Sequence, residues 1–354
     1  MAESENIVAE TAEKIFSDLA DAQTINSDKK GAWKAPLWQA LSEAGLPLAW
    51  VPEECGGSGA SLAEGFSVLS AAGRFAIAVP LAETMLAGWL LAQAKIASPE
   101  GAMTVAPASP KDRIALNADG TLLGRARRVP FARDAQHIAV LAHGPSGLSI
   151  ALVELSGCQI EAGLNLASDG NDTVTFANVA PITIKPAPKA FDQTQLMLMG
   201  GVARSLQIAG SLESMLEVSV RYSNERVAFE KKISKFQAVQ HNLAKLAGES
   251  AAALAAATSA ADAMANSKSF NDEMFLEAAS AKIRCSEAAE KGAAIAHQVH
   301  GAIGFTIEHI LHRYSLRALA WRDDFGSESF WAVELGKLVA ARGADELWPL
   351  VASR

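Results

Sequence analysis

Apolar residues recur at three- and four-residue steps through the first part of the chain, notably over residues 7–20 and 35–46. A helix that buries one face produces this spacing, because one helical turn takes 3.6 residues. Ser61 followed by Glu64 is typical of a capping box at the start of a further helix. The pattern therefore predicts an N-terminal helical domain over residues 1–103.

The apolar period changes to two from residue 104 onward. Residues 149–155 and 173–179 alternate between apolar and polar side chains, as strands with one buried face do. Asn, Asp, Gly and Pro cluster between the alternating stretches and predict tight turns. We therefore expect a small antiparallel β-barrel or sandwich over residues 104–188.

Helical periodicity returns over residues 189–354. Alanine-rich stretches such as residues 249–265 favour helix and allow helices to approach closely. The run Asn271-Asp272-Glu273 places acidic groups where a helix N-terminus favours them. The sequence predicts an antiparallel four-helix bundle here, and hence an α+β multidomain protein with helical, β and helical-bundle parts in that order.

Composition excludes several classes of protein. The formal net charge of −8 leaves no basic stripe for phosphates, so nucleic acid is not expected as a partner. The longest apolar run, residues 85–96, is interrupted by Gly88, Gln93 and Lys95 and is too short to span a bilayer. The acidic N-terminus lacks the pattern of a secretory signal, and the three cysteines are far apart. We expect a soluble cytoplasmic protein that is not bound to a membrane.

Residues 226–241, RVAFEKKISKFQAVQH, form the first candidate binding segment. On a helix, Arg226 and Phe229 would share one face. One interpretation is an exposed arginine beside a core phenylalanine. The other is a phosphate-binding arginine, because the planar guanidinium matches phosphate oxygens two at a time.

The second segment, QVHGAIGF, contains two glycines three residues apart. A helix that ends at Gly301, with Gly304 after it, lets the backbone approach another group closely. A simple corner between two helices would explain the same pattern.

Five of the seven histidines lie in the last third of the chain: His241, His297, His300, His309 and His312. A di-metal bundle would need Glu-x-x-His pairs that project inward from two helices. The region contains no such pair, since Leu311 stands three residues after Glu308. The sequence predicts no metal site.

Together, the two segments resemble signature segments of the acyl-CoA dehydrogenase flavoprotein family. The first is similar to the family pattern R-x-x-F-G-x-x-I-x-x-F-Q-x-x-x-H, with a glutamate, Glu230, in place of the glycine. The matching residues are Arg226, Phe229, Ile233, Phe236, Gln237 and His241. The resemblance implies FAD as cofactor, with Arg226 on its pyrophosphate and Phe229, Phe236 and Gln237 near it.

The second segment carries the remaining implied cofactor contacts. In the family, residues matching Gln298, Gly301 and Ala302 contact the adenylate end of FAD, commonly from the neighbouring subunit. A site shared in this way implies a homo- or hetero-oligomer, a dimer or tetramer. Ser327 matches a contact on the flavin side.

The catalytic base is the point at which the resemblance fails. The family reaction needs a carboxylate that removes the α-proton of an acyl-CoA thioester. Counted from Gln298, the family position of that base is Phe325, and the alternative position, 26 residues before Arg226, is Gly200. Asp324 and Glu328 are the nearby acids that could replace it.

The middle domain is the least similar part of the chain. Family members carry a segment like T-E-P-x-A-G-S-D that lines flavin and substrate, followed by a strand like W-I-T-N-G. Here residues 104–113 keep only the opening of the first, and residues 124–135 stand in place of the second.

The resemblance therefore supports two main hypotheses. The first is an FAD-dependent acyl-CoA dehydrogenase that desaturates a fatty or steroid side-chain acyl-CoA and passes electrons to an electron-transfer flavoprotein. The second is a non-catalytic, FAD-sharing subunit of a heterotetramer. A third is a flavin-free member, which the carboxylate of Glu230 favours because it would repel a pyrophosphate.

Overall fold

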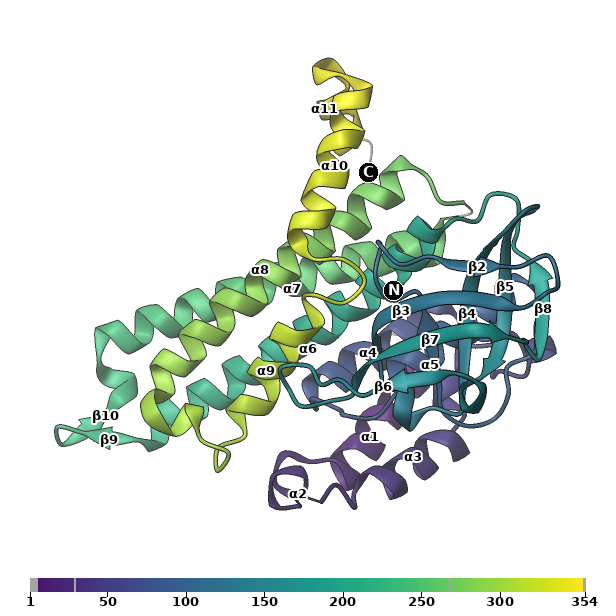
Figure 1. Cartoon of the computed structure of the whole chain (residues 1–354). Coiled ribbons are helices and arrows are strands. Elements are labelled where there is room, and N and C mark those ends of the chain that lie inside the picture. The colour runs from purple at the N-terminus through teal and green to yellow at the C-terminus, as the bar shows by residue number, and fades with distance from the viewer. Residues whose placement is uncertain (1–5, 29, 268, 353–354) are drawn as a thin grey trace. The chain divides into compact units, whose positions relative to one another are not determined.

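The computed structural model describes residues 6–28, 30–267 and 269–352 (Figure 1). Helices come first, strands follow, and long helices complete the chain, so the predicted α+β order is confirmed. The helices are α1 (Ile7–Leu19), α2 (Ala22–Ser27), α3 (Lys34–Glu43), α4 (Leu62–Arg74), α5 (Leu81–Gln93), α6 (Gln193–Glu225), α7 (Gln237–Asn266), α8 (Asp272–His300), α9 (Leu311–Trp321), α10 (Glu328–Arg342) and α11 (Leu347–Ala352). The strands are β1 (Met103–Ala106), β2 (Ile114–Leu116), β3 (Leu122–Pro130), β4 (His137–Gly144), β5 (Gly147–Glu154), β6 (Gln159–Glu161), β7 (Asn171–Val179), β8 (Thr183–Pro186), β9 (Val227–Ala228) and β10 (Lys231–Lys232).

The chain folds into two compact units. Unit 1 contains the described residues up to Ala12, together with Lys34–Val68 and Ala78–Gly200. Unit 2 contains the described parts of Glu13–Trp33, Leu69–Ile77 and Gly201–Arg354. Helices α1, α4 and α6 are each divided between the two units.

Helix α4 begins as its sequence predicts. The Ser61 hydroxyl accepts a hydrogen bond from the backbone N–H of Glu64 at 3.2 Å, and the Glu64 carboxylate accepts one from the backbone N–H of Ser61 at 2.8 Å. The capping box is therefore confirmed, and two N–H groups that the helix itself leaves without partners are satisfied.

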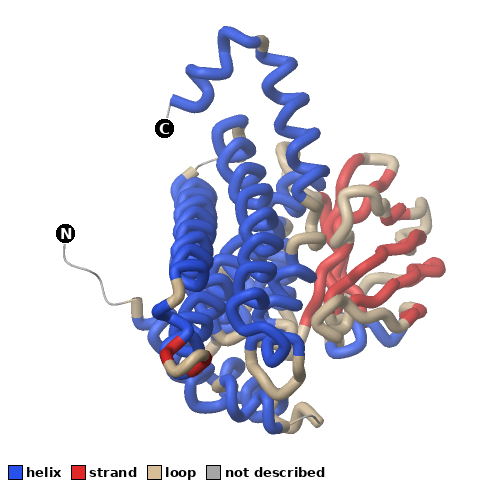
Figure 2. The backbone as a smooth tube through the Cα atoms, turned by 90° about the vertical axis from the view of Figure 1, so that its left-hand side faces the viewer, coloured by secondary structure: helices blue, strands red, loops and turns tan. Residues whose placement is uncertain are grey.

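Unit 1 is organised around one sheet, in the order β6-β7-β3-β2-β4-β5-β8 with β1 beside β4. Figure 2 shows its strands in red. Alternate residues of the strands point into a closed apolar core. Its fully buried members include Ala106, Ile114, Leu122, Val129, Ile138, Val140, Val153, Val174 and Phe176.

Most strand pairs are antiparallel, as predicted, but β4 has two parallel neighbours. Met103 of β1 lies opposite His137 of β4, and Ile114 of β2 lies opposite Ala142, both in parallel register. The antiparallel pairing predicted for this region is therefore confirmed for most strand pairs and wrong for the two pairs that β1 and β2 make with β4. Alternation along a strand reports which face is buried and carries no information on the direction of the neighbouring strand.

Unit 2 is a helical bundle in which α6, α7 and α8 run side by side (Figures 1 and 2). Gly292 of α8 permits the close contact: a Cβ there would lie 2.4 Å from Leu212 of α6 and 3.3 Å from Leu246 of α7. Helices α9 and α10 pack on α8. Asn271 caps α8 by accepting from the Met274 N–H at 2.9 Å, at the start that the acidic run predicts.

Among the described helices, none combines the length and the apolar character that crossing a membrane requires.

Candidate functional site

The segment that begins at Arg226 is a β-hairpin, not the helix that the sequence analysis predicts. Helix α6 ends at Glu225, and strands β9 and β10 pair with Ala228 opposite Lys231. Phe229 and Glu230 form the two-residue turn with φ angles of +50° and +64°. Both central residues of a type I′ turn require positive φ, which glycine adopts without strain. This geometry explains why a glycine suits position 230.

The hairpin presents its candidate residues to solvent. Arg226 is exposed, and no ion pair or side-chain hydrogen bond holds it among residues 6–28, 30–267 and 269–352. Phe229 is 89% exposed and meets Phe236 edge-on, with the ring centroids 6.3 Å apart. Glu230 is also exposed. Gln237 begins helix α7, after the short 3-10 helix Ile233–Lys235 that follows the hairpin.

Gln298, Gly301 and Ala302 line a single cavity of about 710 Å³ in unit 2. Its walls come from the end of α8, the turn 301–305 and α9. Gly301 has a φ of +63°, and open space surrounds the position that a Cβ would take. The backbone at this helix end is thus free to approach a bound group closely.

The hairpin and the cavity belong to the same end of the bundle. Tyr222, one turn before Arg226, stacks on His300 with the ring centroids 4.5 Å apart. Its hydroxyl donates to the His300 carbonyl oxygen at 3.3 Å. The C-terminal ends of α6 and α8 therefore meet, and the two segments that the sequence analysis identifies both start from this contact.

The histidines near this contact form an aromatic cluster. His300 lies 4.6 Å from His309 and His297 stacks on Phe305 at 4.4 Å, both measured between ring centroids. Burial lowers the pKa of all four histidines between positions 297 and 312, and that of His309 falls to about 4. Within the described part of the chain, no group of three or more His, Cys, Asp or Glu side chains is placed to hold a metal.

The base position lies in a turn between α9 and α10. Phe325 is fully buried at φ +54°, and its backbone carbonyl accepts a hydrogen bond from the Trp331 indole at 3.1 Å. Ser327 is the N-cap of α10 and accepts from the Phe330 N–H at 3.3 Å. The turn therefore carries a buried aromatic ring at the position where the sequence resemblance implies a catalytic carboxylate.

Both acids proposed as replacements are held by arginines. Asp324, 8% exposed, accepts from Arg204 Nε at 2.9 Å. Glu328 pairs with Arg322. Partial burial is the largest single influence and raises the pKa of Glu328, but the Arg322 hydrogen bond, a backbone hydrogen bond and the charges of Arg322 and Lys282 together leave this pKa below its usual value. Ion pairing favours the charged form and makes a carboxylate a weaker proton acceptor, so the geometry disfavours both residues as general base.

The other family position for a base is also without an acid. Gly200 and Gly201 lie within α6, and a Cβ on Gly201 would meet the Lys282 side chain at 3.8 Å. Arg204, one turn later, is 2% exposed and lies over the Trp321 and Phe325 rings at 5.9 and 5.8 Å. This arginine is thus part of the core beneath the turn that carries Phe325.

Lys282 is a functional candidate that the sequence analysis missed. It is fully buried in α8, and its Nζ donates to the Trp321 and Arg322 carbonyl oxygens at 3.2 and 2.5 Å. These carbonyls end helix α9, where a cation satisfies free acceptors. Burial lowers the pKa of Lys282 to about 8, against the opposing charges of Asp324 and Asp323. Its position within an alanine-rich helix does not indicate that the side chain is buried against the end of α9.

Replacing Lys282 with methionine is expected to remove a rise in stability between pH 8 and 10.5. The folded-state pKa of about 8 lies below the ordinary 10.5, so the unfolded chain binds more protons across this window. The free energy of unfolding therefore increases with pH there, by about 3 kcal/mol relative to the variant. Urea unfolding of both proteins from pH 7.5 to 10.5 measures the difference. Parallel pH curves would contradict the assignment.

Comparison with known proteins gives one consistent family. The model of the acyl-CoA dehydrogenase N-terminal domain matches residues 2–97, and that of the C-terminal domain matches residues 193–328. Acyl-CoA dehydrogenase IpdE2 of Mycobacterium tuberculosis is 28% identical over 283 residues, 80% of either chain. Acyl-CoA dehydrogenase FadE27 of the same organism is 28% identical over 309 residues, 80% of this chain and 82% of its own.

Solved structures show the same fold over nearly the whole chain. The ChsE4-ChsE5 complex of Mycobacterium tuberculosis contains a chain with a TM-score of 0.85 and 23% identity, covering 97% of this chain and 99% of that one. A Tcur3481-Tcur3483 steroid ACAD variant gives 0.84 and 25% identity, with 95% and 97% covered. Two domain models of one family, in the expected order and with this fold, show that the chain belongs to the acyl-CoA dehydrogenase family of flavoprotein oxidoreductases.

Proposed function

We propose that this chain is an FAD-sharing subunit of a heteromeric acyl-CoA dehydrogenase whose catalytic base comes from a partner chain. One observation carries the proposal: both family positions for the base, Phe325 and Gly200, lack a carboxylate. The two nearest acids are tied to arginines. The partner would supply the group that removes the α-proton of the acyl-CoA.

The residues of unit 2 fit the cofactor. A cavity of about 710 Å³ lies in the size range of nucleotide and cofactor sites. Gln298 would bind the adenylate end of FAD, and the Gly301 backbone would approach it closely. Arg226 would make a bidentate contact with a phosphate group. FAD bound there would supply the hydride acceptor for α,β-desaturation. Because Glu230 is exposed at a turn, it can remain in water beside that phosphate.

The similar proteins support an oligomer and an electron-transfer partner. The ChsE4-ChsE5 and Tcur3481-Tcur3483 structures each pair two different chains. Another similar protein is a subunit, CarC, of the caffeyl-CoA reductase-Etf complex of Acetobacterium woodii. We propose by analogy that a second chain completes this enzyme and that electrons leave through an electron-transfer flavoprotein. Fatty and steroid side-chain acyl-CoAs are the substrate classes to test.

The alternative is that the chain is catalytic alone, with an acid of the base turn as its base. Asp324 directly precedes Phe325, and this position next to the family base is what favours the alternative. It would require Asp324 to leave its pair with Arg204 when substrate binds.

An anaerobic titration distinguishes the two functions. The purified chain, alone and then co-expressed with a family member that carries glutamate at a base position, is mixed with fatty and steroid side-chain acyl-CoAs. We expect bleaching of the oxidised-flavin absorbance only with the partner present. Bleaching of the chain alone would support the alternative, and Asp324→Asn and Glu328→Gln would then locate the base. A protein that is colourless in both preparations would exclude the shared flavin.

A further inference from the structure

A further cavity of unit 2, of about 330 Å³, shares no lining residue with the proposed cofactor cavity. Its walls come from helix α2, from the last part of α6 and from the loop before α9. Asn26 Nδ2 donates to the Glu308 carbonyl oxygen at 2.9 Å and joins α2 to this loop. The volume lies at the lower end of the range of small-molecule sites. The lining includes Ala22, Asn26, Arg221, Glu308, His309 and Ile310, all of them in unit 2.

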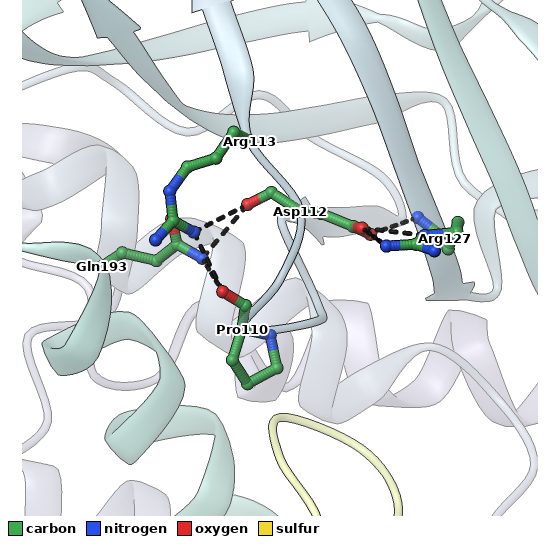
Figure 3. Close-up of polar contacts among 5 residues, drawn as sticks. All are labelled: Pro110, Asp112, Arg113, Arg127 and Gln193. Carbon is green, nitrogen blue, oxygen red and sulfur yellow. Dashed lines mark hydrogen bonds and ion pairs between the residues drawn. The ribbon is translucent and has the colours of Figure 1, made fainter. Parts of the chain in front are cut away.

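The arginine of this cavity, Arg221, differs from the arginines drawn in Figure 3. There Arg127 pairs with the carboxylate of Asp112 through Nε at 2.9 Å and Nη2 at 2.6 Å, and Arg113 Nη1 donates to Gln193 Oε1 at 2.7 Å. Arg221 is exposed, and no ion pair or side-chain hydrogen bond engages it in the part of the chain that the structure describes. Its planar guanidinium is therefore free to bind a carboxylate at two points.

The acids near Arg221 do not neutralise it by direct contact. Glu217 and Glu225 stand one turn before and one turn after it on α6, and Glu217 lies 3.7 Å from Arg74 instead. Glu308, the acid that lines the cavity, is exposed and makes no ion pair with Arg221. The cavity thus presents a positive and a negative group that do not satisfy each other.

His309 adds a neutral donor to the same wall. Its Nδ1 accepts a hydrogen bond from the Leu311 N–H at 3.2 Å, so the proton of the neutral ring is on Nε2. Burial, followed by the charges of His300, Arg221 and two further histidines, lowers the pKa of His309 to about 4. The ring is therefore neutral at physiological pH, and its Nε2–H has no acceptor among the described groups.

We propose that this cavity binds a small carboxylate that carries a hydroxyl or amino group on the carbon next to the carboxylate. The ligand carboxylate would accept two hydrogen bonds from Arg221 and one from His309. A plain carboxylate would bring a like charge to Glu308, whereas a hydroxyl or ammonium group beside it would donate to Glu308. Ala22 and Ile310 leave room for a short apolar side chain.

Propionate, L-lactate and L-alanine test the proposal as a matched series. They share one carbon skeleton and differ only in the group next to the carboxylate. Ligand-observed NMR titration of the whole chain gives the dissociation constant of each acid. We expect L-lactate or L-alanine to bind about tenfold more tightly than propionate, the effect of one charge-assisted hydrogen bond. Tighter binding of L-alanine would identify amino acids as the ligand class, and tighter binding of L-lactate would identify hydroxy acids.

Variants of the two charged residues locate the site. Arg221→Gln should weaken the tighter ligand by about tenfold, with an unchanged melting temperature because the side chain is exposed. Glu308→Gln should remove the preference for that ligand over propionate, because the like charge and the charged acceptor are both gone. Arg128→Gln is the matched control and should change each affinity by less than about twofold. Arg128 of β3 is also exposed and without an ion pair among the described residues, but it does not line the cavity.

Three results would overturn the proposal. The first is the absence of binding for all three acids at millimolar concentrations. The second is the same loss of affinity in Arg221→Gln and Arg128→Gln, which would show general electrostatic attraction and no site. The third is equal affinity of the unaltered chain for propionate, L-lactate and L-alanine, which would leave Glu308 without a role.

Discussion

Replacing Arg204 with leucine is expected to lower the free energy of unfolding by about 3–5 kcal/mol, because the change breaks a buried ion pair by removing one member. Arg204 is 2% exposed and Asp324 is 8% exposed, with Nε and Oδ2 2.9 Å apart. Once the guanidinium is gone, the largely buried Asp324 carboxylate loses this ion pair. Chemical denaturation followed by tryptophan fluorescence measures the loss, since Trp321 and Trp331 flank this turn.

A control and a double variant make this result specific. Arg125→Leu breaks the exposed pair with Glu161, whose side chains are 55% and 75% exposed, and should cost less than about 1 kcal/mol. Arg204→Leu combined with Asp324→Leu should recover part of the stability, because the double change removes both members of the buried pair. A loss below about 1 kcal/mol for Arg204→Leu would contradict the importance of the pair for the base turn.

Arg226→Ala is expected to weaken FAD binding by about 10- to 100-fold, the loss of one charge-assisted contact of about 1.5–3 kcal/mol. The arginine is exposed and free of side-chain partners among the described residues, so its removal should leave the fold unchanged. Titration of the apoprotein with FAD, together with its partner chain if one is needed, measures the change.

The hairpin offers its own control for this variant. Lys232→Ala removes a cation from the strand that follows the turn and should change the affinity by less than threefold. Equal losses of FAD affinity in both variants would indicate general electrostatic attraction rather than a bidentate contact between Arg226 and one phosphate. Unchanged flavin content in Arg226→Ala would remove the role assigned to this residue.

Features that depend on near neighbours in sequence could be predicted. The capping box at Ser61 and Glu64 and the cap of α8 at Asn271 each involve residues within one helical turn, so a short pattern contains the whole interaction. The order of helical and β parts follows from apolar period for the same reason. The clustering of Gln298, Gly301 and Ala302 around a cavity also comes from one continuous stretch.

Other features depend on residues far away in the sequence, which a short sequence pattern does not include. The hairpin at Phe229-Glu230 lacks the Asn-Gly or Gly residues that mark a type I′ turn, so its sequence does not predict a hairpin. Lys282 is buried because the end of α9, 39 residues later, packs on α8. Gln193 meets loop carbonyls more than 80 residues earlier. Contacts between residues so far apart in the sequence produce no repeating pattern of apolar and polar residues, so the sequence alone does not predict them.

Because α6 is divided between the two units, the chain cannot be cut into intact domains at the point where α6 begins. A cut at residue 188, where the apolar period changes, separates Gln193 from the Pro110 and Asp112 carbonyls that it satisfies. It would also strip the sheet unit of Leu196 and Met197, which are fully buried in the intact chain. Gene shuffling at that boundary would therefore yield two incomplete pieces. Helix α6 therefore serves both units: its first residues belong to the sheet unit and the rest to the helical bundle.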